Sequence, residues 1–145
     1  MKPDIVNHPP HYTSHPSGME CIQLSRLFPF ALGNFIKYLW RSGEKDDVQQ
    51  ERRKARWYLD DFIHNTQLLP EDEEGELVRT IARFLRNMDD KFWRPEDEIL
   101  IAFFGDLLNN IGTIGMFKTF LLRIYESLDQ LIEDNEDDAP QTANQ

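Results

Sequence analysis

Polar and charged side chains recur at helical spacing in two neighbouring stretches of the chain. Asn34, Lys37 and Arg41 stand at i, i+3 and i+7, so they share one face of a predicted helix. The next predicted helix has a comparable face, which consists of Glu51, Lys54, Tyr58 and Asp61. In an antiparallel hairpin the two faces would line a positively charged groove. Cationic side chains bind phosphate, and an arginine can fix its geometry through two parallel hydrogen bonds.

The same stretches supply aromatic rings and a further cation. Trp57 and Tyr58 could stack on a nucleotide base, and Lys45 lies just beyond the predicted end of the first helix. A plainer interpretation stays open, because the helix dipole alone favours cations such as Arg41 and Lys45 at a helix C-terminus. The spacing therefore predicts a phosphate or nucleotide site, with ordinary solvated helix faces as the alternative.

Three histidines, His8, His11 and His15, stand in a proline-rich segment over residues 3–16. The prolines make this segment extended or turn-like, which gives the histidines no fixed geometry around a metal ion. We therefore predict no metal site formed by the protein. We expect instead that the segment docks over the groove, with His11 and Tyr12 contacting the ligand or buried carbonyl groups.

The familiar nucleotide and metal motifs are missing from the sequence. No two glycines have P-loop spacing followed by Lys-Ser or Lys-Thr, and GxGxxG, HExxH and CxxC do not occur. A protein of this sequence that transferred phosphate would do so without the standard kinase parts.

Composition limits the class of protein further. The chain of 145 residues has one cysteine, Cys21, which excludes an intramolecular disulfide. No apolar run reaches the length that spans a membrane, so we predict a cytoplasmic protein. The net charge of −10 argues against sequence-independent binding to nucleic acid, and we predict no sequence-specific nucleic-acid binding either. Residues 26–58 nevertheless carry a net charge of +4, and a small basic island suits a small anion better than a long polyanion.

Hydrophobic periodicity predicts an all-α fold, a compact bundle of about six helices. The first three helices are expected over residues 17–27, 30–42 and 47–65, and the other three carry apolar stripes within 77–88, 99–107 and 117–128. A capping box that starts at Ser17 and a cap at Asp47 mark two helix starts. Pro95 suits the first position of a helix, and Gly43 suits the position after one.

We predict a single helical domain over residues 1–132 and a disordered acidic tail over 133–145. The stretches ILIAFF and MFKTFLL place bulky side chains around most of each helix, which indicates burial on two sides. A homo-oligomer formed through these C-terminal helices would supply the second side. Packing within one core is the alternative.

Four ordered segments of the first half resemble a known family. They are VNHPPHY at 6–12, GMECI at 18–22, LGNFIKYLWRSGEK at 32–45 and KARWYL at 54–59. Together they resemble the phage SaV-like, nucleotide-kinase-like proteins over about residues 6–63. The second half, from about residue 67, lies outside this resemblance.

The resemblance implies nucleotide binding by a phage protein in the cytoplasm of its host. More specifically, it implies a deoxynucleoside monophosphate kinase that takes phosphate from a nucleoside triphosphate without a P-loop. Resemblance and spacing together assign the catalytic roles to Lys37, Arg41, His11 and Glu20. The predicted nucleotide-binding residues are Asn7, His8, Tyr12, Asn34, Tyr38, Lys45, Lys54, Trp57 and Tyr58. Magnesium could accompany the nucleotide.

Three alternatives stay open. A non-catalytic phage protein that sequesters a host defence signalling nucleotide would need the same groove but no acid or base. A helical nucleoside triphosphate pyrophosphohydrolase would need carboxylates on facing helices to hold magnesium. Asp60, Asp61 and the acidic run over 71–76 do not form such a paired set. The last alternative is an interaction protein whose apolar C-terminal helices bind a host factor.

Overall fold

The computed structural model of the chain describes residues 4–44, 47–65, 72, 74–91, 93–110 and 114–137, and their side chains except those of 11, 13, 114–118, 136 and 137. These ranges contain helices, turns and no strand, which confirms the predicted all-α class. The helices are α1 (Pro10–Thr13), α2 (Cys21–Ser25), α3 (Phe30–Trp40), α4 (Val48–Asn65), α5 (Glu76–Met88), α6 (Pro95–Asn109) and α7 (Ile114–Asp137).

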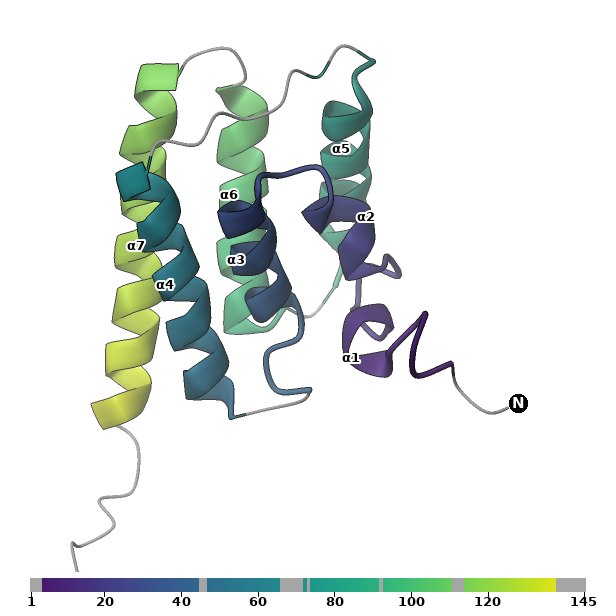
Figure 1. Cartoon of the computed structure of the whole chain (residues 1–145), viewed down its shortest axis with the longest axis horizontal. Coiled ribbons are helices and arrows are strands. Elements are labelled where there is room, and N and C mark those ends of the chain that lie inside the picture. Colours follow the sequence, from purple (N-terminus) through teal and green to yellow (C-terminus); the bar gives the residue numbers. More distant parts are fainter. Residues whose placement is uncertain are drawn as a thin grey trace, which may run out of the picture.

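The helices form two layers that divide the chain at its middle (Figure 1). The first layer contains α2, α3 and α4, and the second contains α5, α6 and α7. The contacts between the layers pair α2 with α5, α3 with α6, and α4 with α7. Residues 21–65 therefore supply one layer, and the C-terminal half of the chain covers its inner face.

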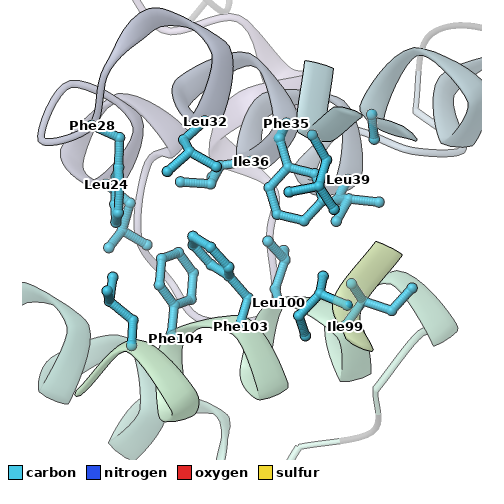
Figure 2. Close-up of a cluster of buried hydrophobic side chains, with 14 of the residues drawn as sticks. Leu24, Phe28, Leu32, Phe35, Ile36, Leu39, Ile99, Leu100, Phe103 and Phe104 are labelled. Atoms are coloured by element: carbon cyan, nitrogen blue, oxygen red, sulfur yellow. The ribbon is translucent and has the colours of Figure 1, made fainter. Parts of the chain in front are cut away.

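Apolar side chains fill the space between the layers. Figure 2 shows Leu32, Phe35 and other residues of α2 and α3 facing Leu100, Phe103 and Phe104 of α6. The predicted stripes of α3, α5 and α6 are buried as expected. The predicted stripe of α4 consists of Val48, Ala55, Leu59 and Phe62, and of these only Val48, which is 36% exposed, is not buried. Helix α6 lies between α3, α5 and α7, and these contacts bury much of its apolar surface within one chain. The homo-oligomer stays a prediction.

Several helix boundaries follow the signals in the sequence. The side chain of Asp47 accepts a hydrogen bond from the backbone N–H of Gln50 at 3.0 Å, which satisfies a free donor at the start of α4. Pro95 occupies the first turn of α6, where its missing N–H costs no hydrogen bond. Gly43 has φ +87°, a left-handed conformation that glycine adopts without strain.

Other boundaries differ from the prediction. Helix α2 begins at Cys21 with Glu20 as its N-cap, whereas the sequence pointed to Ser17. The side chain of Ser17 instead contacts His15 Nδ1 at 2.9 Å and accepts the N–H of Met19 at 3.2 Å. Within the segment predicted to be extended, Pro10 starts the short helix α1. The acidic tail was predicted to be disordered from residue 133, but α7 continues through residue 137.

No helix in the described ranges is both long enough and apolar enough to cross a membrane.

Candidate functional site

Arg41 lies at the end of α3 in a buried ion pair with α4. Its Nε donates to Glu51 Oε2 at 2.6 Å, its Nη2 donates to Glu51 Oε1 at 3.3 Å, and its Nη1 donates to the hydroxyl of Tyr12 at 3.1 Å. Burial acts to lower the pKa of Arg41, but the bonds to Glu51 and Tyr12 outweigh it and raise that pKa. Arg41 was predicted to hold phosphate, yet here it fastens α3 to α4 and to the N-terminal segment.

An aromatic stack occupies the face where the helical spacing predicted a groove. The rings of Tyr38 and Tyr58 lie with centroids 5.6 Å apart and nearly parallel. Lys37 Nζ and Lys54 Nζ lie 4.6 and 5.4 Å from the centroid of the Tyr38 ring, within the range of a cation–π contact. Trp57 meets Tyr58 edge-on and is 63% exposed. The side chains that face each other across the α3–α4 hairpin are therefore in contact and leave no groove between them.

A pocket of about 200 Å³ lies next to Lys37, the lysine that contacts this stack. Four predicted site residues line it, namely Asn7, Tyr12, Glu20 and Lys37. The other lining residues are Pro9, Cys21, Ile22 and Ser25. None of these residues comes from α4, so the expected groove between α3 and α4 is replaced by a pocket between α3, α2 and the N-terminal segment. We call it the Lys37 pocket.

Of the lining residues that the structure describes, Lys37 is the one cation. Among the described residues its ammonium group forms no ion pair with a carboxylate. Glu20 lines the same pocket and is held by His8, whose Nδ1 lies 2.8 Å from Glu20 Oε1. The pocket thus offers one cation for an anionic group and one carboxylate for a hydroxyl or amine.

The thiol of Cys21 also lines the pocket, but it is not suited to nucleophilic chemistry. Burial raises the pKa of Cys21 to about 12, and the hydrogen bond to Ser25 and the charges of Lys37 and Arg41 oppose this only in part. The thiolate is the reactive form of cysteine. Cys21 therefore acts as an apolar wall at neutral pH.

The N-terminal turn that carries Asn7 is held by Asp4, a residue that no motif in the sequence marks as functional. Asp4 accepts hydrogen bonds from the backbone N–H groups of Val6 and Asn7 and from the side-chain amide of Asn7. The bonds from Asn7 are the main cause of a lowered pKa of Asp4. This turn places Asn7 at the pocket.

Other predicted residues lie away from the pocket. Asn34 donates to the carbonyl of Phe30 within its own helix at 2.9 Å, and Lys54 lies 3.5 Å from Glu51 Oε1. Trp57 and Tyr58 belong to the aromatic stack. Lys45 and the side chain of His11 lie outside the described residues.

His15 belongs to a second polar cluster, which is buried between the layers. Its Nδ1 accepts the N–H of Ser17 at 3.1 Å, so the ring proton lies on Nε2, 2.7 Å from Asp97 Oδ1. Its ring stacks on Trp40 at 4.0 Å between centroids. Arg94 binds Asp97 and donates to the carbonyls of Leu39, Trp40 and Ser42 at the end of α3. This cluster fixes the end of α3, and no pattern in the sequence links residues so far apart.

No group of three or more His, Cys, Asp or Glu side chains is arranged for a metal ion within the part of the chain that the structure describes.

Comparison with known proteins gives one family match. The model of a family described as a protein of unknown function, DUF3310, matches residues 6–60. No curated protein and no solved structure matches the chain. Every residue that lines the Lys37 pocket lies within the matched range, whereas Arg94 and Asp97 lie outside it. Over residues 6–60 the chain is therefore similar to a family of unknown function.

Proposed function

We propose that this chain binds nucleotides in the Lys37 pocket and acts there as a P-loop-independent deoxynucleoside monophosphate kinase. The observation that carries the proposal is the meeting of Asn7, Tyr12, Glu20 and Lys37 around one pocket. These residues come from three separate segments, and each was selected for nucleotide handling. The resemblance to phage nucleotide-kinase-like proteins supports the same activity, on the nucleotide pool of the host cytoplasm.

The chemistry of the pocket suits the sugar-phosphate part of a monophosphate. Lys37 would bind the phosphate, because an ammonium group attracts it as a point charge. Glu20, held by His8, would accept a hydrogen bond from a sugar hydroxyl. A volume of about 200 Å³ is small beside pockets that enclose whole ligands. The base would therefore extend past Ile22, which is 56% exposed at the rim.

The proposed reaction needs positioning and charge neutralisation more than covalent help. A phosphate oxygen of the bound monophosphate attacks the γ-phosphorus of a nucleoside triphosphate. The bond from this phosphorus to the bridging oxygen breaks, and a nucleoside diphosphate leaves. Lys37 would neutralise part of the charge on the acceptor, and magnesium carried by the triphosphate would neutralise more.

A second candidate is a non-catalytic nucleotide binder, and the position of Arg41 favours it. Since Arg41 is buried against Glu51 and Tyr12, Lys37 is the one cation among the described residues that line the pocket. One cation suffices to hold a monophosphate. Several cations stabilise a triphosphate better while its terminal phosphoryl group is transferred.

A chromatographic assay separates these candidates. The purified protein is incubated with each deoxynucleoside monophosphate and each triphosphate, with and without magnesium, alongside the variants Lys37→Gln and Arg123→Gln. Arg123 is an exposed cation of α7 and serves as the control for the lost charge. A kinase forms diphosphate at the expense of the monophosphate, and Lys37→Gln loses this activity while Arg123→Gln keeps it.

Other outcomes would change the conclusion. A monophosphate retained through gel filtration without turnover would make the protein a binder. Release of pyrophosphate would make it a hydrolase. Neither binding nor conversion of any nucleotide would overturn the proposal.

A further inference from the structure

Helix α5 carries a row of arginines on the side opposite its apolar stripe. Arg79, Arg83 and Arg86 stand at i, i+4 and i+7, so their side chains share one face. Arg26, directly after α2, adds a fourth guanidinium. All four line an open groove of about 670 Å³ between α2 and α5. The remaining lining residues are Gln23, Glu76, Thr80 and Ala82.

Within the part of the chain that the structure describes, few carboxylates compensate the positive charge of this groove. Arg83 and Arg86 form no ion pair or side-chain hydrogen bond with any residue that the structure describes. Arg26 lies 3.8 Å from Glu76, and both of these side chains are more than half exposed. Arg79 donates to the carbonyl of Glu74 at 2.6 Å, a contact that leaves its charge in place. Like charges one helical turn apart repel each other, and a bound anion would relieve this repulsion.

The fold fixes the backbone positions from which the three arginines of α5 extend. The opposite face of α5 is buried in the core through Leu77, Ile81, Phe84 and Met88. A rigid helix lowers the entropy cost of binding a ligand at its exposed face. Arg86 also lines an adjoining hollow of about 390 Å³, whose charged lining residues further include Lys91 and Asp90.

We propose that this groove binds a compact polyphosphate anion, of which the triphosphate group of a free nucleotide is the natural example. Guanidinium groups bind phosphate oxygens in pairs of parallel hydrogen bonds, and several arginines suit several adjacent phosphates. No aromatic residue lines the groove, so it offers no stacking surface for the bases of a single strand. The net charge of −10 also opposes a long polyanion. Recognition is therefore through phosphate and is indifferent to the base.

The groove is separate from the Lys37 pocket, and this inference does not depend on the proposed kinase activity. The two sites use different sides of α2, since Ile22 and Ser25 line the pocket whereas Gln23 and Arg26 line the groove.

Calorimetric titration of the full-length protein tests the inference. The probes are inorganic tripolyphosphate, the four ribonucleoside triphosphates, a monophosphate and an oligothymidylate. Tripolyphosphate is expected to bind, the four triphosphates to bind with similar affinity, and added salt to weaken all of them. The double variant Arg83→Gln/Arg86→Gln is expected to lose tripolyphosphate affinity by at least about tenfold. Arg123→Gln is expected to retain it.

Three results would overturn the inference. The first is no binding of tripolyphosphate to the wild type. The second is unchanged binding to the double variant, whose folding is checked by its circular dichroism spectrum. The third is tighter binding of the oligothymidylate than of tripolyphosphate, which would assign the groove to single-stranded nucleic acid.

Discussion

The buried charged side chains that the structure describes lie against partners of opposite charge. Asp97 accepts hydrogen bonds from His15 and from Arg94, and the Arg94 guanidinium also reaches carbonyl groups at the end of α3. Among the described side chains, no buried nitrogen or oxygen lacks a hydrogen-bond partner. Burial acts to raise the pKa of Asp97, but the bonds from His15 and Arg94 outweigh it, so that pKa lies well below its usual range.

Asp97→Asn is expected to lower the free energy of unfolding by roughly 3 kcal/mol at neutral pH, because it leaves buried donors without their anion. Urea denaturation of the variant and the wild type measures this difference. A lowered pKa in the folded state stabilises the protein above the unfolded pKa of about 4. The contribution is lost as the pH falls through the folded pKa, so the two proteins should converge in acid. Equal stability at pH 7 would contradict this account of the cluster.

Helices α2 and α3 approach each other closely at a single glycine. A methyl group on Gly33 would lie 2.9 Å from the backbone carbonyl oxygen of Ser25, which cannot move without shifting α2. Because Cys21, Ile22 and Ser25 line the Lys37 pocket, this contact sets one wall of the site.

Gly33→Ala is therefore expected to destabilise the protein by roughly 1–3 kcal/mol, as overpacking does elsewhere. Gly105 of α6 is the matched control, because nothing lies within 4 Å of a methyl group placed there. Gly105→Ala should raise stability by roughly 0.5–1 kcal/mol, since alanine is the better helix former. Thermal unfolding followed by circular dichroism measures both changes. Equal effects of the two substitutions would show that the close approach is unimportant.

Sequence reasoning predicted elements better than contacts. The stripes of α3, α5 and α6, the cap at Asp47 and the position of Pro95 depend on local spacing, which the sequence displays directly. The start of α2 was wrong because Ser17 is bound by His15. That histidine is itself placed by Asp97, which is 82 residues away in sequence.

The candidate site shows the same difference between local spacing, which the sequence displays, and long-range contacts, which it does not. Helical spacing correctly placed Lys37 and Arg41 on one face. It could not show how deeply each side chain is buried. Arg41 is buried against Glu51, and Tyr38 stacks on Tyr58, so the hairpin closes where a groove was expected. The Lys37 pocket depends on how the N-terminal turn docks, and Asp4 sets that turn through bonds that no periodicity reveals.

At the scale of the whole molecule, the two layers depend on each other. The inner face of the first layer is apolar and covered by α6, and polar contacts also join the two layers. Arg52 Nε donates to Glu96 Oε1 at 2.6 Å, and Arg56 pairs with Asp129 of α7. The range that matches a known family ends within the first layer.

A fragment of residues 1–66 is therefore expected not to fold on its own, because it would expose Leu32, Phe35 and Ile36 of α3 to water. Its circular dichroism should show no cooperative thermal transition. Addition of a fragment of residues 67–145 should restore one. Cooperative unfolding of the first fragment alone would show instead that the family-like layer is an independent domain.

The most direct test of the central claim is a calorimetric titration of each deoxynucleoside monophosphate into the wild type, Lys37→Gln and Arg123→Gln. At least one monophosphate is predicted to bind the wild type and Arg123→Gln equally. Lys37→Gln is predicted to bind it at least about tenfold more weakly, because a charge-assisted contact is lost. The same affinity in all three proteins, or no binding to any of them, would contradict a nucleotide site at Lys37.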